Sequence, residues 1–102
     1  MRIISFNVNG IRAITKKDFF DDLEKMDADI LCLQETKSTV DQLKEALEGV
    51  EGYFIYGNEA ERKGYSGTAL LSRKEPISVQ YDMGISEHDQ EGRVICAEYD
   101  DF

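Results

Sequence analysis

The sequence is poor in residues that cross-link or stiffen a chain. It has one proline and two cysteines among 102 residues, and it has no internal repeat or low-complexity stretch. Cys32 and Cys96 each lie within a short apolar run, which is typical of reduced thiols in a protein core rather than of a disulfide or a metal site. The composition therefore indicates an ordinary globular chain without a Pro-rich or Ser-rich linker.

Long apolar runs and basic residues are scarce as well. No apolar segment reaches the length of a membrane span, and the segment from Met1 to Phe6 does not resemble a secretion signal. We therefore expect a cytoplasmic protein that does not bind a membrane. The chain has 12 Lys and Arg residues but 21 Asp and Glu residues, which gives a formal net charge of −9. This charge argues against nucleic-acid binding, because phosphates attract cations, but acidic groups can hold a divalent cation.

The first half of the sequence predicts two strands and two helices. Residues 2–8 and 29–35 are apolar runs typical of buried strands, and Thr15 is a candidate cap for a helix between them. A helix between two buried strands forms a βαβ unit, so we expect the strands to be parallel. Thr39 and Gln42 have the spacing of a capping box, which predicts the start of a second helix.

The second half of the sequence predicts strands separated by polar loops. The expected strands are residues 53–56, 68–72, 77–80 and 94–99, and the expected loops are residues 57–67 and 82–92. Helices come early in this order and hairpin-like strands come late, which favours an α/β fold with a mixed sheet. At 102 residues the chain is one domain or a piece of one.

Polar side chains end both early strands. The first strand ends in Asn7-Val8-Asn9, and the second ends in Gln34-Glu35. In a parallel βαβ unit, ligands bind beyond the carboxyl ends of the strands. Amide and carboxylate oxygens suit Mg²⁺ or Mn²⁺, so Asn7, Asn9 and Glu35 are candidate metal ligands. On spacing alone the alternative stays open that the asparagines shape a turn and the glutamate is a solvated strand end.

Basic and aromatic residues lie near the same predicted edge. The cations closest to it in the chain are Arg12, Lys16, Lys17 and Lys37. They are candidates for phosphate contacts, with ordinary solvated surface charge as the alternative. Tyr65 sits in a loop between glycines, where an aromatic ring can stack at a nucleic-acid groove or fill a hairpin turn. His88 has no Ser or Cys nucleophile placed against it, which favours a role in shaping its loop over general-base catalysis.

Four segments, in order along the chain, resemble the signatures of the exonuclease III and apurinic–apyrimidinic (AP) endonuclease family. They are residues 5–13 (SFNVNGIRA), 31–37 (LCLQETK), 64–69 (GYSGTA) and 87–95 (EHDQEGRVI). Together they cover nearly the whole chain, and four blocks in register are much more specific than any one alone. The resemblance implies the N-terminal portion of a four-layer α/β sandwich with two packed mixed β-sheets. Residues 1–102 would form the N-terminal part of an endonuclease/exonuclease/phosphatase domain.

The resemblance also implies roles for single residues. Glu35 looks like the metal-binding glutamate, and Asn7 looks like the amide beside it that helps to hold the metal and the scissile phosphate; these two are the expected catalytic residues. Asn9 matches a position where some members carry aspartate, and it is a further expected metal ligand. The implied cofactor is Mg²⁺, with Mn²⁺ as an alternative. The expected contacts with DNA are Arg12, Ala13, Lys37, Tyr65 and Arg93.

The implied activity is that of a Mg²⁺-dependent DNA-repair nuclease. In the family, a water attacks the phosphodiester 5′ to an abasic sugar in double-stranded DNA, and a 3′–5′ exonuclease activity is a further expectation. The family's second half supplies a cleft tyrosine, an aspartate–asparagine pair and an aspartate–histidine pair, none of which can be assigned before Phe102. We therefore expect the C-terminal half of the domain to be absent and the chain alone to be inactive.

Two further expectations concern the chain as a separate unit. Without a second half, an apolar sheet face would stay uncovered, which predicts self-association. The alternatives to a repair nuclease are a non-catalytic half-domain and another phosphoesterase of the superfamily, acting on phospholipid or inositol phosphate.

Overall fold

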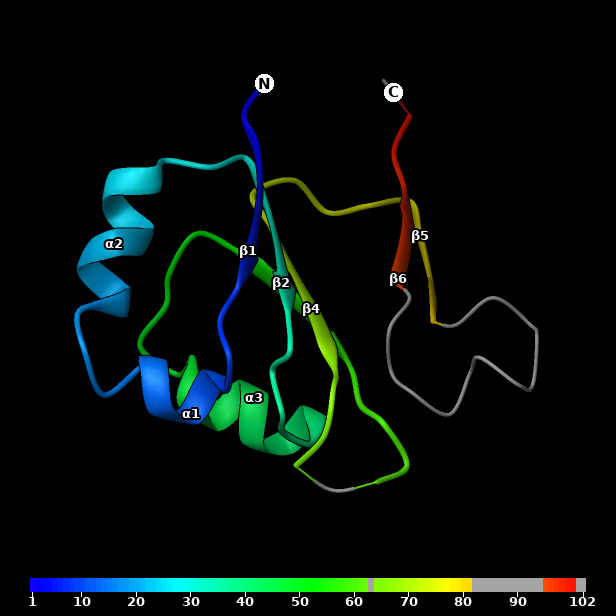
Figure 1. Cartoon of the computed structure of the whole chain (residues 1–102). Helices are drawn as coiled ribbons and strands as arrows, with labels where there is room; N and C mark the ends of the chain where they lie inside the picture. The colour runs from blue at the N-terminus through cyan, green and yellow to red at the C-terminus, as the bar shows by residue number, and fades with distance from the viewer. Residues whose placement is uncertain (63, 82–94, 101–102) are drawn as a thin grey trace.

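The fold is a mixed sheet with helices on one face and a smaller sheet beside the other, as a computed structural model shows (Figure 1). The structure describes residues 1–62, 64–81 and 95–100. The elements in chain order are β1 (Ile3–Asn7), α1 (Ile11–Ile14), α2 (Phe19–Met26), β2 (Ile30–Gln34), α3 (Val40–Ala46), β3 (Phe54–Asn58), β4 (Thr68–Ser72), β5 (Ser78–Tyr81) and β6 (Ile95–Glu98). None of the helices in these ranges is long and apolar enough to span a bilayer.

Four strands form the main sheet in the order β1-β2-β4-β3. β1 and β2 are parallel, with Ile3 opposite Ile30 and Asn7 opposite Gln34, whereas β4 is antiparallel to both of its neighbours. The predicted βαβ unit and mixed sheet are therefore confirmed. The register brings the carboxyl ends of β1 and β2 to one edge of the sheet, which we call the site edge. The other end of the same strands is the opposite edge, where the N-terminus lies (Figure 1).

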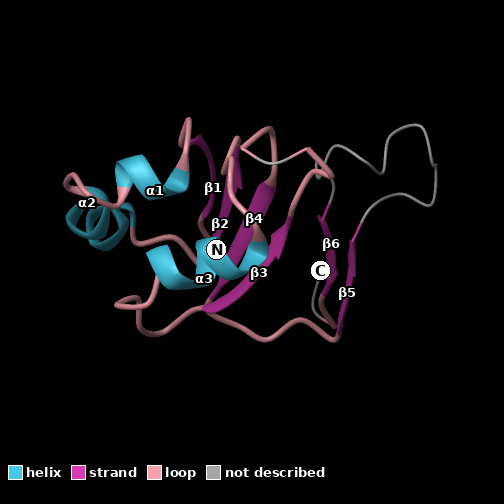
Figure 2. Ribbon diagram, turned by 90° about the horizontal axis from the view of Figure 1, so that it is seen from below, coloured by secondary structure: helices cyan, strands magenta, loops and turns pink. Residues whose placement is uncertain are grey.

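The helices cover one face of this sheet and form the main core (Figure 2). Apolar side chains that alternate along the strands point to this face and pack against apolar side chains of the helices. The fully buried members of the core include Leu31, Leu33 and Leu71 from the strands and Ile11, Phe19, Leu43 and Leu47 from the helices and the end of α3. Gly57 of β3 allows α3 to approach closely, because a Cβ atom there would come within 2.4 Å of Leu43 Cδ2. This packing holds α1 and α3 next to the site edge, where they flank the ends of β1 and β2 (Figure 1).

The other face of the sheet, which we call the far face, is covered in part by the β5–β6 ribbon (Figure 2). Tyr99, which follows β6, packs with Ile30 and Leu70, and its hydroxyl donates to Ser72 Oγ at 2.7 Å. Cys32 lies half-buried on this face, and burial raises the pKa of its thiol.

The uncovered part of the far face is apolar. Ile3 and Phe54 lie in the same row of paired residues as Ile30, and they are 58% and 44% exposed. The layer order of helices, four-stranded sheet and second sheet agrees with the expected portion of an α/β sandwich.

One local prediction is confirmed, and two others differ from the structure. The capping box at Thr39 and Gln42 is confirmed, with both reciprocal hydrogen bonds present. The predicted helix between the first two strands is present as α2, but its predicted start at Thr15 is wrong, because the Thr15 hydroxyl donates back to Ile11 O and Thr15 ends α1 instead. Both cysteines are free, but Cys96 is exposed on β6, so the prediction that it lies in a core is wrong as well.

Candidate metal and phosphate site

The site edge brings Asn7 and Glu35 into direct contact. Because β1 and β2 are parallel and in register, Val8 N donates to Gln34 O at 3.0 Å, and the chains leave both strands side by side. The Asn7 side-chain amide then donates to Glu35 Oε2. Two residues that are 28 positions apart in the sequence thus present their polar side chains at one point.

Backbone hydrogen bonds join the segments that follow the two strands. Gly10 N donates to Glu35 O at 2.7 Å, and Ile11 N donates to Thr36 O at 2.9 Å. Gly10 has a φ of 99°, which an L side chain rarely adopts, so glycine is required for this turn. The entry to α1 and the exit from β2 are therefore held as one unit.

Asn9 and Lys37 form a second pair beside the first. Asn9 N donates to Asn7 Oδ1 at 2.9 Å, and Lys37 Nζ donates to Asn9 Oδ1 at 2.7 Å. The Asn9 oxygen is thus directed to an ammonium group, which would oppose a metal ion at the same atom because like charges repel. The geometry favours Asn9 as a support for Lys37, and the prediction that it is a metal ligand stays a prediction.

An open basic hollow of about 460 Å³ adjoins these residues. Its lining residues are Asn9, Gly10, Arg12, Ala13, Lys16, Lys37 and Gly64, none of which is acidic. Arg12 is fixed there by a hydrogen bond from Nη2 to Lys37 O at 3.1 Å. Three of the predicted DNA contacts, Arg12, Ala13 and Lys37, therefore share one surface next to Glu35. A local cluster of cations on a chain of net charge −9 indicates an anion-binding surface.

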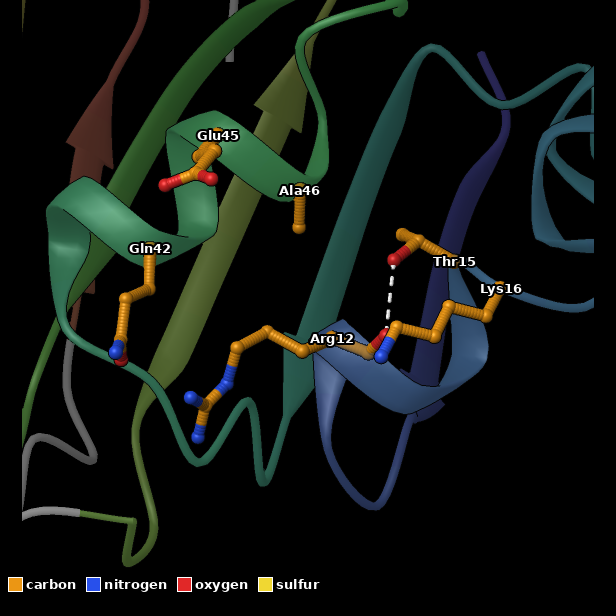
Figure 3. A pocket seen from close by; sticks show the side chains of 6 residues that line it. All are labelled: Arg12, Thr15, Lys16, Gln42, Glu45 and Ala46. Atoms are coloured by element: carbon orange, nitrogen blue, oxygen red, sulfur yellow. Dashed lines mark hydrogen bonds between the residues drawn. The ribbon is translucent and has the colours of Figure 1, made fainter.

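A second hollow of about 360 Å³ lies on the other side of Arg12, between α1 and α3 (Figure 3). Arg12 of α1 and the following residues Thr15 and Lys16 line it on one side, whereas Gln42, Glu45 and Ala46 line it from α3. Arg12 and Lys16 line both hollows. The basic hollow also contains Lys37, whereas the second hollow contains Glu45.

The remaining predicted DNA contacts lie in the later loops. Tyr65 is 39% exposed, and the Arg62 guanidinium lies 5.4 Å from the centroid of its ring. This loop borders the basic hollow through Gly64, so Tyr65 comes near the other predicted contacts. Arg93 and His88 lie outside the described residues.

A family comparison adds a second line of support to this geometry. Residues 4–102 match the sequence profile described as the Endonuclease/Exonuclease/phosphatase family. The chain belongs to this family. The expectation from the four signature segments is thereby confirmed, and the family is one whose members are nucleases or other phosphoesterases.

Similar proteins include nucleases from distant organisms. An exodeoxyribonuclease of Bacillus subtilis is 52% identical over 101 residues, which are 98% of this chain but 39% of that protein. The DNA repair nuclease APEX1 of Danio rerio is 48% identical over all of this chain and 34% of its own length. An AP endonuclease structure from Archaeoglobus fulgidus has a TM-score of 0.79 and 33% identity over 95% of this chain and 37% of that one. The chain thus spans about two fifths or less of these relatives.

The donor set at the site edge fits a hydrated divalent ion of the kind that this family uses. Within the described residues no three His, Cys, Asp or Glu side chains gather to form a protein-only metal cage. Mg²⁺ seldom needs such a cage, because it keeps several waters and uses one or two carboxylates together with phosphate oxygens of the substrate. Glu35 would supply the carboxylate, and Asn7 would orient it by donating to Oε2.

Sequence reasoning assigned no role to Ser66 and Gly67. Their carbonyl groups accept hydrogen bonds from Lys37 N at 2.7 Å and from Thr36 N at 3.1 Å, so they hold the loop that carries Glu35. The signal that could have indicated them is the glycine at position 67, which lies in one of the four segments that resemble the family signatures. Its partner in space lies about 30 residues earlier, which no local pattern reveals.

Proposed function

We propose that this chain carries the metal-holding part of a Mg²⁺-dependent DNA-repair nuclease. The proposed reaction is hydrolysis of the phosphodiester 5′ to an abasic site in double-stranded DNA, with trimming of 3′ ends as a further activity. The observation that carries the proposal is the contact between Asn7 and Glu35, beside a hollow lined by Arg12, Lys16 and Lys37. Family membership and the names of the similar nucleases support it.

The described residues would have different roles in this reaction. Glu35 would hold the ion, and Asn7 keeps the carboxylate in one orientation by its hydrogen bond. The bound ion would stabilise negative charge on the phosphate and on the leaving oxygen. Lys37, oriented by Asn9, and Arg12, fixed on Lys37 O, would bind phosphate oxygens along the hollow.

Activation of the attacking water needs a base that these residues do not supply. Asparagine and arginine side chains do not accept a proton, and the single histidine of the sequence, His88, lies outside the described ranges. We infer that Asn7 and Glu35 alone give weak or no hydrolysis, although they still bind the ion. Metal binding is therefore a more direct test than turnover.

The experiment compares the unchanged chain with Glu35→Ala and with Glu24→Ala, a matched control on α2. Mn²⁺ binding is followed by the relaxation of water protons, and nicking of a duplex with one abasic site is followed with Mg²⁺. We expect Glu35→Ala to lose Mn²⁺ binding and Glu24→Ala to keep it. Equal Mn²⁺ affinity in all three chains would overturn the proposal. Strong nicking that depends on Glu35 would overturn the inference that a further base is required.

We also propose that the chain by itself associates through the far face. Ile3 and Phe54 are exposed large apolar side chains on the part of this face that β5 and β6 leave uncovered. Sedimentation should therefore show a dimer or larger species, and Phe54→Lys should shift it toward the monomer. A clean monomer with a cooperative melt in the unchanged chain would contradict this proposal.

A further inference from the structure

The loop that carries Glu35 is held on both sides by other segments. On one side Gly10 N and Ile11 N donate to Glu35 O and Thr36 O. On the other side Thr36 N and Lys37 N donate to Gly67 O and Ser66 O. The backbone from Glu35 to Lys37 thus uses donors and acceptors in both directions, and its conformation depends on both neighbours.

Backbone strain is concentrated at this junction. Five non-glycine residues in the described ranges have a positive φ, and four of them meet here: Asn9, Glu35, Lys37 and Ser66. Each such residue costs on the order of 1 kcal/mol, so the conformation persists only where surrounding bonds enforce it. The hydrogen bonds that Ser66 O and Gly67 O accept from Lys37 N and Thr36 N therefore help to set the direction in which the side chains of Glu35 and Lys37 leave the backbone.

Gly67 can lie this close to Thr36 only because it has no side chain. A Cβ atom at this position would come within 2.4 Å of Thr36 Oγ1 and 3.4 Å of Asn58 O, and the φ of 88° disfavours any L residue. Thr36 is 1% exposed, so its hydroxyl has little room to move away. An added methyl group must displace either the Gly67 segment or the Glu35 loop.

We propose that Gly67 and Thr36 are positioning residues for the proposed metal site. Their contact sets the distance between the Tyr65 loop and the Glu35 loop, and through it the contact between Asn7 and Glu35. The loop proposed to meet DNA, which carries Tyr65 two residues before Gly67, is thereby connected by backbone hydrogen bonds to the segment of the carboxylate proposed to hold the ion. The proposal rests on the proposed function for the role of the ion, but its geometric part stands without it.

The test follows the side-chain amide signal of Asn7 in nuclear magnetic resonance spectra of the metal-free chain. Gly67→Ala should move this signal because it shifts Glu35, the acceptor of that amide. The double variant Gly67→Ala with Thr36→Ala should move it back toward its original position, because the closest atom in the collision is gone. With Mn²⁺, Gly67→Ala should weaken binding about 10-fold or more, as expected for a residue that supports a metal ligand.

Gly52→Ala is the matched control. Gly52 has a φ of 84°, similar to that of Gly67, but no atom lies within 4 Å of its added Cβ, and it precedes β3 at the opposite edge. It should reduce stability through the backbone alone and leave the Asn7 signal unchanged. An Asn7 signal that responds equally to both glycine variants would overturn the proposal.

Hydrogen exchange in the unchanged chain covers the case in which Gly67→Ala does not fold. The amides of Thr36 and Lys37 should exchange slowly, because each donates to the Ser66–Gly67 segment. Exchange as fast as in an exposed loop would overturn the proposal without any variant. Absence of Mn²⁺ binding in the unchanged chain would instead count against the proposed function, since the amide signal and the exchange rates do not require an ion.

Discussion

The basic residues at the two edges of the main sheet have different surroundings. At the opposite edge, charges are paired: Arg73 lies 2.6 Å from Asp27, and its guanidinium also stacks 5.4 Å from the Tyr53 ring centroid. At the site edge, Arg12, Lys16 and Lys37 line the basic hollow, which has no acidic lining residue, although Arg12 and Lys16 also line the second hollow, which contains Glu45. Arg73 at the opposite edge thus has an acidic partner within the protein, whereas the cations of the basic hollow are those that we propose to bind phosphate.

The backbone conformation also differs between the two edges. Four of the five left-handed non-glycine residues in the described ranges lie at the site edge, and the fifth, Asp27, ends α2, where such a conformation is common. Strain that persists at one place in a small domain has to be offset by packing elsewhere. The comparison therefore implies that packing in the core and at the opposite edge stabilises the fold. The strained backbone of the site edge offsets part of this stabilising free energy.

The largest expected effect comes from removing packing on the far face beside the opposite edge, where Tyr99 contacts Ile30 and Ser72. Tyr99→Ala deletes a ring that is 7% exposed and leaves the Ser72 hydroxyl without its donor, so unfolding free energy should fall by about 3–5 kcal/mol. Tyr81→Ala is the control, because this tyrosine of β5 is 43% exposed and should lose much less. Urea titrations measure both. Equal midpoints for the two variants would remove the basis for the contrast between the edges.

A cation of the site edge should matter for DNA and little for stability. Lys16→Glu should weaken binding to abasic duplex several-fold and lower the salt dependence of the binding constant by about 0.9 for each phosphate that the variant no longer neutralises. Lys25→Glu on α2 makes the same change in net charge away from the hollow. Fluorescence anisotropy at several salt concentrations separates the two. A similar decrease in affinity for both variants would show that net charge, rather than the hollow, governs binding.

A smaller expected effect is the change in stability when the backbone strain at Glu35 is relieved, and the sign of this change is the test. Glu35→Gly relieves a φ of 54° and should leave stability unchanged or raise it by up to about 1 kcal/mol, while it removes the proposed metal ligand. Glu24→Gly makes the same chemical change within α2 and should lower stability by about 0.5–1 kcal/mol. Thermal melts with and without Mn²⁺ report both quantities. Equal losses of stability would mean that Glu35 is not strained.

The sequence correctly predicted the features that depend on local pattern and on the order of elements along the chain. Apolar runs around a helix predicted the parallel pair β1–β2, and the parallel pair predicted that Asn7 and Glu35 share an edge. The capping box at Thr39 is a three-residue signal, so it too was predictable. In each case the determining contacts are either local or imposed by a rule of handedness and register.

The sequence did not predict features that depend on competing local hydrogen bonds or on contacts between distant segments. Thr15 has the chemistry of a helix cap, but its hydroxyl bonds to the preceding turn, a choice that depends on how α1 packs. The left-handed turn at Glu35 depends on the carbonyl groups of Ser66 and Gly67, about 30 residues away. Such contacts exist only after the sheet has formed, so the sequence pattern around either segment does not contain them.

The smallest expected effect concerns the ion pair at the opposite edge and its dependence on pH. The hydrogen bond from Arg73, followed by its charge, lowers the pKa of Asp27 below the ordinary aspartate value. A carboxylate with a lowered pKa in the folded state adds stability above its unfolded pKa, and this contribution disappears as the pH falls through the folded value. The decrease should therefore occur below about pH 4.

Asp27→Asn should flatten that acid limb while it preserves the left-handed turn, which asparagine tolerates. Arg73→Met should flatten the same limb, and the double variant should flatten it no further, because the Arg73–Asp27 interaction is the main cause of the lowered pKa of Asp27. Arg73→Met also removes the guanidinium from the Tyr53 ring, so its stability differs at every pH and only the slope is informative. Independent, additive slopes would show that the pair does not act as a unit, and the opposite edge would then owe its stability to packing alone.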